Sequence, residues 1–156
     1  MVLYLVRHGE AKKETEDPAQ GLTDKGREQV RSTASSASKL IPRLSEILHS
    51  PKRRAEQTAE ILADRLKPER GTRPADHLLP LDDPGIWATR VADMREDIML
   101  VGHLPFLAKL AGLLLCGDQD KIFVEFGTAG MLCLSRSGEG RWSVKWMIVP
   151  EMSTDR

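Results

Sequence analysis

Three short strand-like segments, each followed by a helical pattern, most constrain how this chain of 156 residues can fold. Residues 2–6 form a continuous apolar run that ends at a charged, glycine-containing turn, as expected for a strand buried on both faces. Residues 46–49 and 97–101 predict two further strands of this kind. Because strands alternate with helices, the pattern predicts an α/β protein with a largely parallel sheet.

Helical spacing and turn signals predict the elements between these strands. Thr23 is a candidate N-cap for a helix that runs to about residue 40 and stops before Pro42. Further helices are predicted over residues 52–66, between residues 84 and 95, and after His103. We expect a surface loop over residues 67–75, a short strand over residues 77–81, and a hairpin made of residues 131–134 and 142–149. The spacing of Trp142 and Trp146 places both on one face of the last strand.

Composition narrows the class of protein. The absence of repeats, low-complexity tracts and long linkers predicts a single domain over residues 1–156. A formal net charge of zero gives no general attraction to nucleic acid or to an anionic membrane, so we expect neither partner, and any anion site must be local. Cys116 and Cys133 lie in apolar surroundings and predict buried thiols in a reducing compartment. With no targeting or membrane-spanning segment evident, we expect a cytoplasmic protein.

Basic side chains follow each of the three predicted strands. Arg7 and His8 end the first, Arg54 lies shortly after the second, and His103 follows the third. Each residue alone has an ordinary structural explanation, such as a hydrogen-bonding histidine or a solvated arginine. Ligands of open α/β sheets bind beyond the carboxyl ends of the strands, and helix N-termini there favour anions. The joint pattern therefore predicts one anion pocket.

The residues around this predicted pocket match a known family. Four segments carry the match, in this order: Arg7-His8-Gly9-Glu10, Leu22-Thr23-x-x-Gly26, Ser50-Pro51-x-x-Arg54-Ala55-x-Gln57-Thr58 and Val101-Gly102-His103. They resemble the motifs of the histidine phosphatase superfamily, whose signature is Arg-His-Gly. The short chain and the Leu104-Pro105 pair after His103 are similar to the SixA-type phosphohistidine phosphatases. The resemblance covers about residues 1–135 and implies a three-layer, phosphoglycerate-mutase-like α/β/α sandwich without large insertions.

The same resemblance implies a role for each matching residue. His8 would be the nucleophile that becomes phosphorylated, Arg7 and Arg54 would bind the phosphoryl oxygens, and His103 would hydrogen-bond the same group. Arginine suits this task because its fixed fork of donors fits phosphate oxygens. Two nearby guanidinium groups should also lower the pKa of His8 and keep its nucleophilic nitrogen unprotonated. We expect no cofactor and no metal.

One expected part is missing, namely the general acid. Larger relatives supply a Glu from the middle of the chain, and the equivalent position here is near Pro80. Asp82 and Asp83 are candidates for the acid, although both also suit a solvated turn. A phosphorylated imidazole can carry a proton on its second nitrogen and leave uncharged, so a weak acid suits phosphohistidine better than a sugar phosphate.

Three functions are consistent with these residues. The first is a phosphohistidine phosphatase acting on a phosphorylated protein, such as a phosphotransfer domain. The second is a phosphomonoesterase with the same mechanism and a small phosphate substrate. The third is a non-catalytic phosphoprotein-binding module, which the retained nucleophile His8 argues against.

Overall fold

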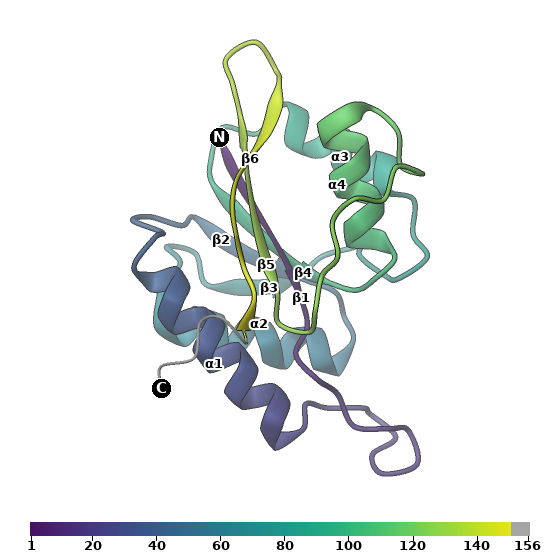
Figure 1. The fold of residues 1–156 in the computed structure, drawn as a ribbon. Coiled ribbons are helices and arrows are strands. Elements are labelled where there is room, and N and C mark those ends of the chain that lie inside the picture. Colours follow the sequence, from purple (N-terminus) through teal and green to yellow (C-terminus); the bar gives the residue numbers. More distant parts are fainter. Residues whose placement is uncertain (151–156) are drawn as a thin grey trace.

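A computed structural model describes residues 1–150 of the chain, and its elements alternate as the sequence predicts. Figure 1 shows them in order: β1 Val2–Arg7, α1 Asp24–Ser38, β2 Glu46–His49, α2 Arg53–Leu66, β3 Thr72–Pro74, α3 Pro84–Ala92, β4 Ile98–Gly102, α4 Phe106–Cys116, β5 Met131–Arg136 and β6 Trp142–Ile148. The three buried strands and the C-terminal hairpin are confirmed.

The strands form one six-stranded sheet in the order β3-β2-β4-β1-β5-β6. Neighbouring strands from β3 to β1 pair in parallel, whereas β5 pairs antiparallel with β1 and with β6. The sheet is therefore mostly parallel, as predicted, and β1 and β4 lie at its centre. Both are long apolar runs because strands at this position are covered on both faces.

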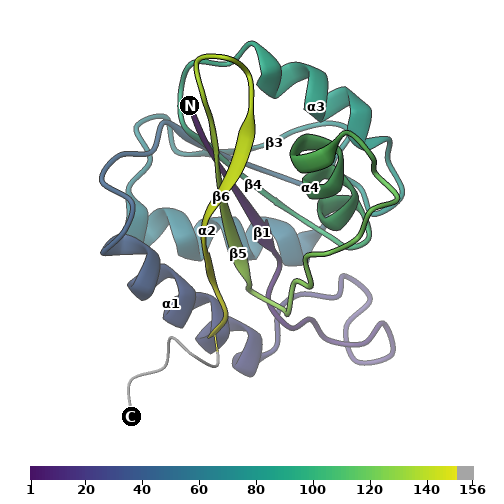
Figure 2. The same cartoon turned by 45° about the horizontal axis from the view of Figure 1, so that its top comes forward.

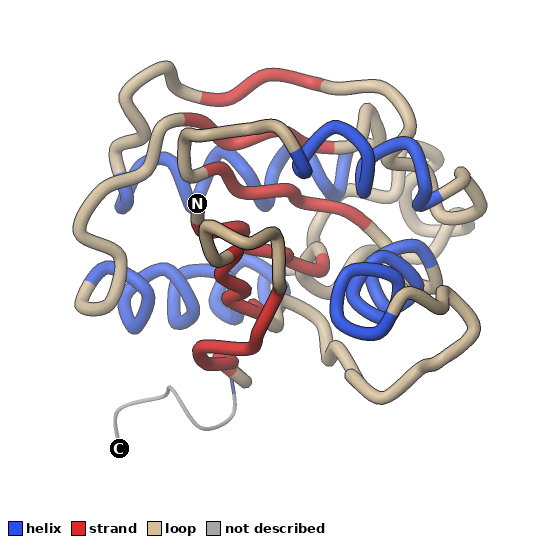
Figure 3. The backbone as a smooth tube through the Cα atoms, turned by 90° about the horizontal axis from the view of Figure 1, so that it is seen from above, coloured by secondary structure: helices blue, strands red, loops and turns tan. Residues whose placement is uncertain are grey.

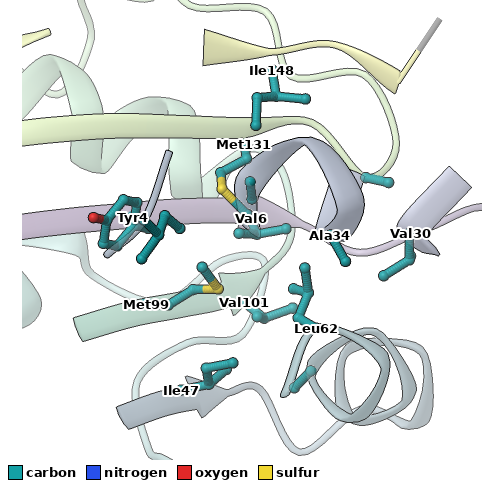
Figure 4. Close-up of a cluster of buried hydrophobic side chains, with 14 of the residues drawn as sticks. Tyr4, Val6, Val30, Ala34, Ile47, Leu62, Met99, Val101, Met131 and Ile148 are labelled. Atoms are coloured by element: carbon teal, nitrogen blue, oxygen red, sulfur yellow. The ribbon is translucent and has the colours of Figure 1, made fainter. Parts of the chain in front are cut away.

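Helices cover both faces of the sheet, which gives three layers (Figure 3). Helices α1 and α2 pack on one face around Val30, Ala34 and Leu62, and Figure 4 shows these side chains against Val6 and Val101. Helices α3 and α4 cover the other face with a second buried cluster. Between α2 and β4 the chain has only a short strand and a nine-residue helix, which confirms the prediction of a core without large insertions.

The segment between α2 and α3 differs from the prediction. Residues 67–75 are not only a loop, because Thr72–Pro74 forms the edge strand β3 beside β2. Proline is tolerated there since an edge strand leaves one side of its backbone unpaired. The strand predicted over residues 77–81 is wrong. His77 has a φ of 59°, outside the β region, and the Asp82 side chain accepts a hydrogen bond from the Leu79 N–H at 2.8 Å to form a turn.

Two further predictions about side-chain placement are wrong. Trp142 packs with the α3 and α4 cluster, whereas Trp146 packs with the α1 and α2 cluster and contacts Tyr4. The ladder shifts register between Cys133 and Leu134, so the bulged strand β6 changes the face on which later side chains lie. Cys133 is buried as expected, but Cys116 is exposed because it ends α4 where the helix leaves the sheet; both are free thiols.

A search of the described residues for a helix long and apolar enough to cross a membrane finds none.

Candidate active site

The register of the central strands brings three of the predicted site segments together. Arg7 pairs with Gly102 across β1 and β4, and His49 pairs with Val101 across β2 and β4. One residue further on, the His8 N–H donates to the Gly102 carbonyl at 3.1 Å, and the Ser50 N–H donates to the Val101 carbonyl at 3.0 Å. His8, Ser50 and His103 are thus the first residues after three adjacent strands. The predicted convergence at the carboxyl edge of the sheet is what the fold produces.

His8 is held in one tautomer. Its Nδ1 lies 2.7 Å from the carbonyl oxygen of Gly9, and since a carbonyl can only accept, Nδ1 carries the hydrogen. In the neutral ring Nε2 then keeps its lone pair. Burial, together with the charges of Arg54 and Arg7, lowers the pKa of His8 to about 4, although the hydrogen bond to Gly9 acts in the opposite direction. The direction matches the prediction, but burial rather than the two guanidinium groups is the largest cause.

His103 lies beside His8, with the ring centroids 5.1 Å apart. Its side chain is buried, and Nε2 is 2.7 Å from the Ser50 hydroxyl oxygen. Burial lowers the pKa of His103 to about 3, with His8 and Arg54 contributing in the same direction. Nδ1 of His103 is the one buried side-chain nitrogen or oxygen that has no hydrogen-bond partner within residues 1–150. A buried polar atom without a partner is costly, which makes this nitrogen a candidate for a contact with a ligand.

Arg7 and Arg54 supply the positive charge at this edge of the sheet. Arg7 ends β1, and its Nη1 donates to the Phe126 carbonyl at 2.7 Å. Arg54 lies in the first turn of α2, and both side chains are half-buried. Burial lowers the pKa of each guanidinium, and neither forms a salt bridge with a carboxylate of the described chain. Their charge is therefore available to an anion.

The loop that precedes β5 closes this region from the far side of β1. It runs back from α4 to the end of β1, as Figure 2 shows, and the Ala129 N–H donates to the His8 carbonyl at 3.1 Å. Arg7 contacts the same loop through its backbone as well, because its own N–H donates to the Gly130 carbonyl at 3.1 Å. The loop therefore lies against the end of the strand that carries Arg7 and His8.

Two glycines allow the first loop to lie directly on α1. A Cβ on Gly9 would come within 2.8 Å of the Gly26 carbonyl oxygen, and a Cβ on Gly26 would come within 2.1 Å of the Glu10 carbonyl oxygen. Thr23 caps the helix by accepting the Gly26 N–H at 2.9 Å, as predicted, and its hydroxyl donates to the Glu10 carboxylate at 2.8 Å. The second motif therefore supports the loop that carries His8.

The third motif supports the same loop through side chains of α2. Thr58 accepts the Gly9 N–H at 3.0 Å and donates to the Arg54 carbonyl at 2.8 Å. Gln57 accepts the Leu22 N–H at 2.7 Å. Thr58 thus links the loop that carries His8 to the turn that carries Arg54. The sequence analysis did not assign these contacts or the contact between Ser50 and His103. For Ser50, the available signal was its position directly after a strand, which it shares with His8.

The two candidate acids are both engaged in turns. Asp82 accepts the Leu79 N–H, and Asp83 is the N-cap of α3, where its side chain accepts the Gly85 N–H at 2.9 Å. These bonds agree with the structural alternative, a polar turn before a helix. A role for either carboxylate as general acid stays a prediction.

Metal ligands do not gather in the part of the chain that the structure describes. Within residues 1–150, no three His, Cys, Asp or Glu side chains lie close enough to hold a metal ion.

The structure is thus an α/β fold in which two arginines and two histidines of lowered pKa lie together at the carboxyl edge of the sheet. Comparison with known proteins agrees with this class. Residues 3–75 match the family model described as the histidine phosphatase superfamily, branch 1. A curated relative, the phosphohistidine phosphatase SixA of Escherichia coli, is 26% identical over 155 residues, which cover 96% of this chain and 94% of the relative.

Solved structures extend the likeness over the whole fold. The protein histidine phosphatase SixA in complex with tungstate superposes with a TM-score of 0.88 and 23% identity, covering 99% of this chain and 100% of that one. A mycobacterial glucosyl-3-phosphoglycerate phosphatase superposes with a TM-score of 0.71 and 19% identity, covering 92% and 96%. The resemblance inferred from the four motifs is confirmed, because the chain is similar to the histidine phosphatase superfamily over residues 3–75 and to SixA over nearly its whole length. These matches support a phosphatase.

Proposed function

We propose that this protein is a phosphohistidine phosphatase that acts on a phosphorylated protein, with His8 as the nucleophile. The observation that carries the proposal is the state of His8: an uncharged imidazole with Nδ1 bonded to the Gly9 carbonyl and a free lone pair on Nε2. His8 lies near Arg7, Arg54 and His103. The positive charges of the two arginines and the unpartnered Nδ1 of His103 suit a phosphoryl group. The SixA relative, solved with the oxyanion tungstate, supports an anion of this kind.

The proposed reaction has two steps. Nε2 of His8 attacks phosphorus, a new N–P bond forms, and the N–P bond to the substrate imidazole breaks. The leaving imidazole takes the electron pair of that bond and departs neutral because its second nitrogen carries a proton. Water then attacks the phosphorylated His8, the N–P bond breaks, and inorganic phosphate leaves.

The arginines and His103 stabilise charge during both steps. In phosphoryl transfer the charge is spread over the equatorial oxygens, so donors already aimed at them do most of the work. Arg7 is fixed for this by its bond to the Phe126 carbonyl, and Arg54 by its place in the first turn of α2. The hydrogen-bonded network under the loop keeps these groups in place without substrate, which lowers the reorganisation needed during reaction.

The surroundings of the pocket favour a protein substrate. Only β3 and α3 lie between α2 and β4, so there is little chain to cover the site. An apolar groove lined by Leu104, Pro105 and Phe126 adjoins His103 and Arg7, and Ile122 and Phe123 are exposed on the neighbouring loop. A partner protein can lay apolar side chains there while its phosphohistidine enters the pocket.

A phosphomonoesterase acting on a small molecule is the alternative. It would use the same His8 chemistry, and the mycobacterial glucosyl-3-phosphoglycerate phosphatase shares the fold. This alternative requires an acid that protonates an alcohol leaving group, and Asp82 and Asp83 are engaged in turn and cap hydrogen bonds. A third candidate is a module that binds a phosphoprotein without turnover.

A panel assay distinguishes these functions. A histidine-phosphorylated protein, an aryl phosphate and an alkyl phosphate are offered to the wild-type protein and to His8→Ala, and release of phosphate is measured. The proposal expects the phosphohistidine protein to be the best substrate and His8→Ala to be inactive on all three. Faster turnover of the alkyl phosphate would favour the esterase, and tight binding of the phosphoprotein without turnover would favour the binding module.

A further inference from the structure

We propose that Ser50 is a positioning residue that sets the tautomer of His103, so that the hydrogen of the ring sits on Nδ1. The inference deepens the proposed function, because Nδ1–H is the group that would meet a phosphoryl oxygen. It rests on a buried contact between two residues that come from neighbouring strands. Neither the four motifs nor the comparisons assign a role to this serine.

The contact itself leaves the direction of donation open. The Ser50 hydroxyl oxygen and Nε2 of His103 are 2.7 Å apart, and either atom could supply the hydrogen. The hydroxyl oxygen already accepts from the Lys52 N–H at 3.3 Å. If Nε2 also donated to this oxygen, the hydrogen of the buried hydroxyl would have no acceptor, since within residues 1–150 the contacts of the Ser50 side chain are those with the Lys52 N–H and with Nε2 of His103. The hydroxyl therefore donates to the ring.

The charge state of His103 completes the argument. Burial favours the uncharged ring, and an uncharged imidazole has one nitrogen that donates and one that accepts. If Nε2 accepts from Ser50, the hydrogen must sit on Nδ1. This is the nitrogen that lacks any partner among the described residues. An N–H at that place can bond a phosphoryl oxygen, whereas a lone pair there would repel it.

The backbone of Ser50 is anchored on both sides, so the hydroxyl is fixed in direction. Its N–H bonds the Val101 carbonyl of β4, and its carbonyl accepts from Nδ1 of His49 at 2.8 Å. Ser50 has no exposed surface and His103 is 2% exposed, so solvent does not compete for the bond. The pairing of β2 with β4 thus positions the backbone from which the Ser50 hydroxyl extends.

The two histidines of the site then have opposite roles. In His8 the Gly9 carbonyl holds the hydrogen on Nδ1 and leaves a lone pair on Nε2 for phosphorus. In His103 the Ser50 hydroxyl occupies the lone pair on Nε2 and leaves a hydrogen on Nδ1 for oxygen. A backbone carbonyl and a side-chain hydroxyl therefore produce a nucleophile and a donor from the same residue type.

The tautomer of His103 is measured directly by two-bond ¹H–¹⁵N NMR on the resting protein at neutral pH. We expect Nδ1–H in the wild type and a shift toward Nε2–H in Ser50→Ala. Ser45→Ala is the matched control, since Ser45 is a buried serine that precedes β2 at the opposite end of the strand. It should leave the signal unchanged. Nε2–H in the wild type, or unchanged Nδ1–H in Ser50→Ala, would overturn the proposal.

Turnover supplies a second readout. We expect kcat of Ser50→Ala to fall about 10- to 100-fold. Losses of this size are typical in metal sites when the group that hydrogen-bonds and orients a functional histidine is removed. Ser50→Cys keeps the size and a weak donor, so it should fall between the wild type and Ser50→Ala, and it replaces Ser50→Ala if that variant does not fold. Wild-type kcat in every folded Ser50 variant would contradict the inference. The NMR result is independent of substrate, so a failure of the phosphohistidine proposal alone would leave the tautomer as measured.

Discussion

The imidazole rings of His8 and His103 lie with their centroids 5.1 Å apart and their planes inclined by 59°. His103 is buried and His8 is half-buried, and each has one nitrogen bound to a protein group, the Gly9 carbonyl for His8 and the Ser50 hydroxyl for His103. A charge on His8 would disfavour a charge on His103, and the arginines disfavour both. The pair therefore stays uncharged near neutral pH, and under the proposed function the two guanidinium groups would carry the positive charge that a phosphoryl group requires.

An NMR titration of the histidines tests this charge assignment. The ordinary histidine pKa is 6.5, and burial lowers that of His8 to about 4, so His8 should remain uncharged as the pH falls from 6.5 toward 4. The unfolded chain takes up a proton first, so the free energy of unfolding should decrease over the same range. A midpoint near 6.5 for His8 would contradict the assignment.

Replacing the nucleophile should abolish turnover. His8→Ala removes Nε2, the nitrogen that would form the covalent intermediate. We expect no phosphate release and no radioactive label on the protein after incubation with ³²P-labelled substrate, with a circular dichroism spectrum like that of the wild type. His77→Ala is the control, because His77 lies in the turn before α3 and pairs with Asp76. A folded His8→Ala protein with wild-type rates would refute the mechanism.

Substitution of two neighbouring arginines of α2 distinguishes the effect of a charge at the site from that of a charge on the surface. Arg54→Ala should weaken phosphate binding and cost about 2–4 kcal/mol of transition-state binding, similar to the loss of a preorganised oxyanion donor. Arg53→Ala is the matched control, because Arg53 is exposed and pairs with Glu56 at 2.6 Å. Phosphate inhibition constants and kcat/KM of both variants measure the difference. Equal effects of the two substitutions would remove Arg54 from the site.

The sequence was sufficient for the parts of the fold and the site that depend on local patterns. The buried strands β1 and β4 were predictable because their apolar runs are continuous, and His8 and His103 follow directly from where those runs end. Thr23 was predictable as an N-cap because capping involves only the next three residues.

The parts that were missed depend on distant partners. β3 is a strand only because β2 lies beside it, and Trp146 lies on an unexpected face because of a bulge opposite Cys133. The Ser50 bond to His103 spans 53 positions, and the Arg7 bond to Phe126 spans 119. Neither contact follows from spacing along the chain, and the burial that dominates the pKa of His8 also arises only once the layers have packed.

Activity should survive removal of metal ions. The described residues contain no cluster of metal ligands, and Arg7 and Arg54 can neutralise the phosphoryl charge. We expect kcat after EDTA treatment and gel filtration to equal that of the untreated protein. Activity that is lost with EDTA and restored specifically by Mg²⁺ would show that a metal takes part.

The leaving group tests the missing acid. Asp82→Asn and Asp83→Asn each remove a carboxylate but keep an oxygen for the bond to the Leu79 or Gly85 N–H, so the turn and the cap should persist. Loss of a true general acid costs about 10²–10⁴-fold, whereas we expect each substitution to change phosphohistidine hydrolysis only slightly. Aryl phosphates should be cleaved slowly and alkyl phosphates very poorly, because an alkoxide needs a proton to leave and a phenolate needs it less. Efficient alkyl phosphate hydrolysis that one of the two substitutions abolishes would identify that aspartate as a working acid and favour the phosphomonoesterase.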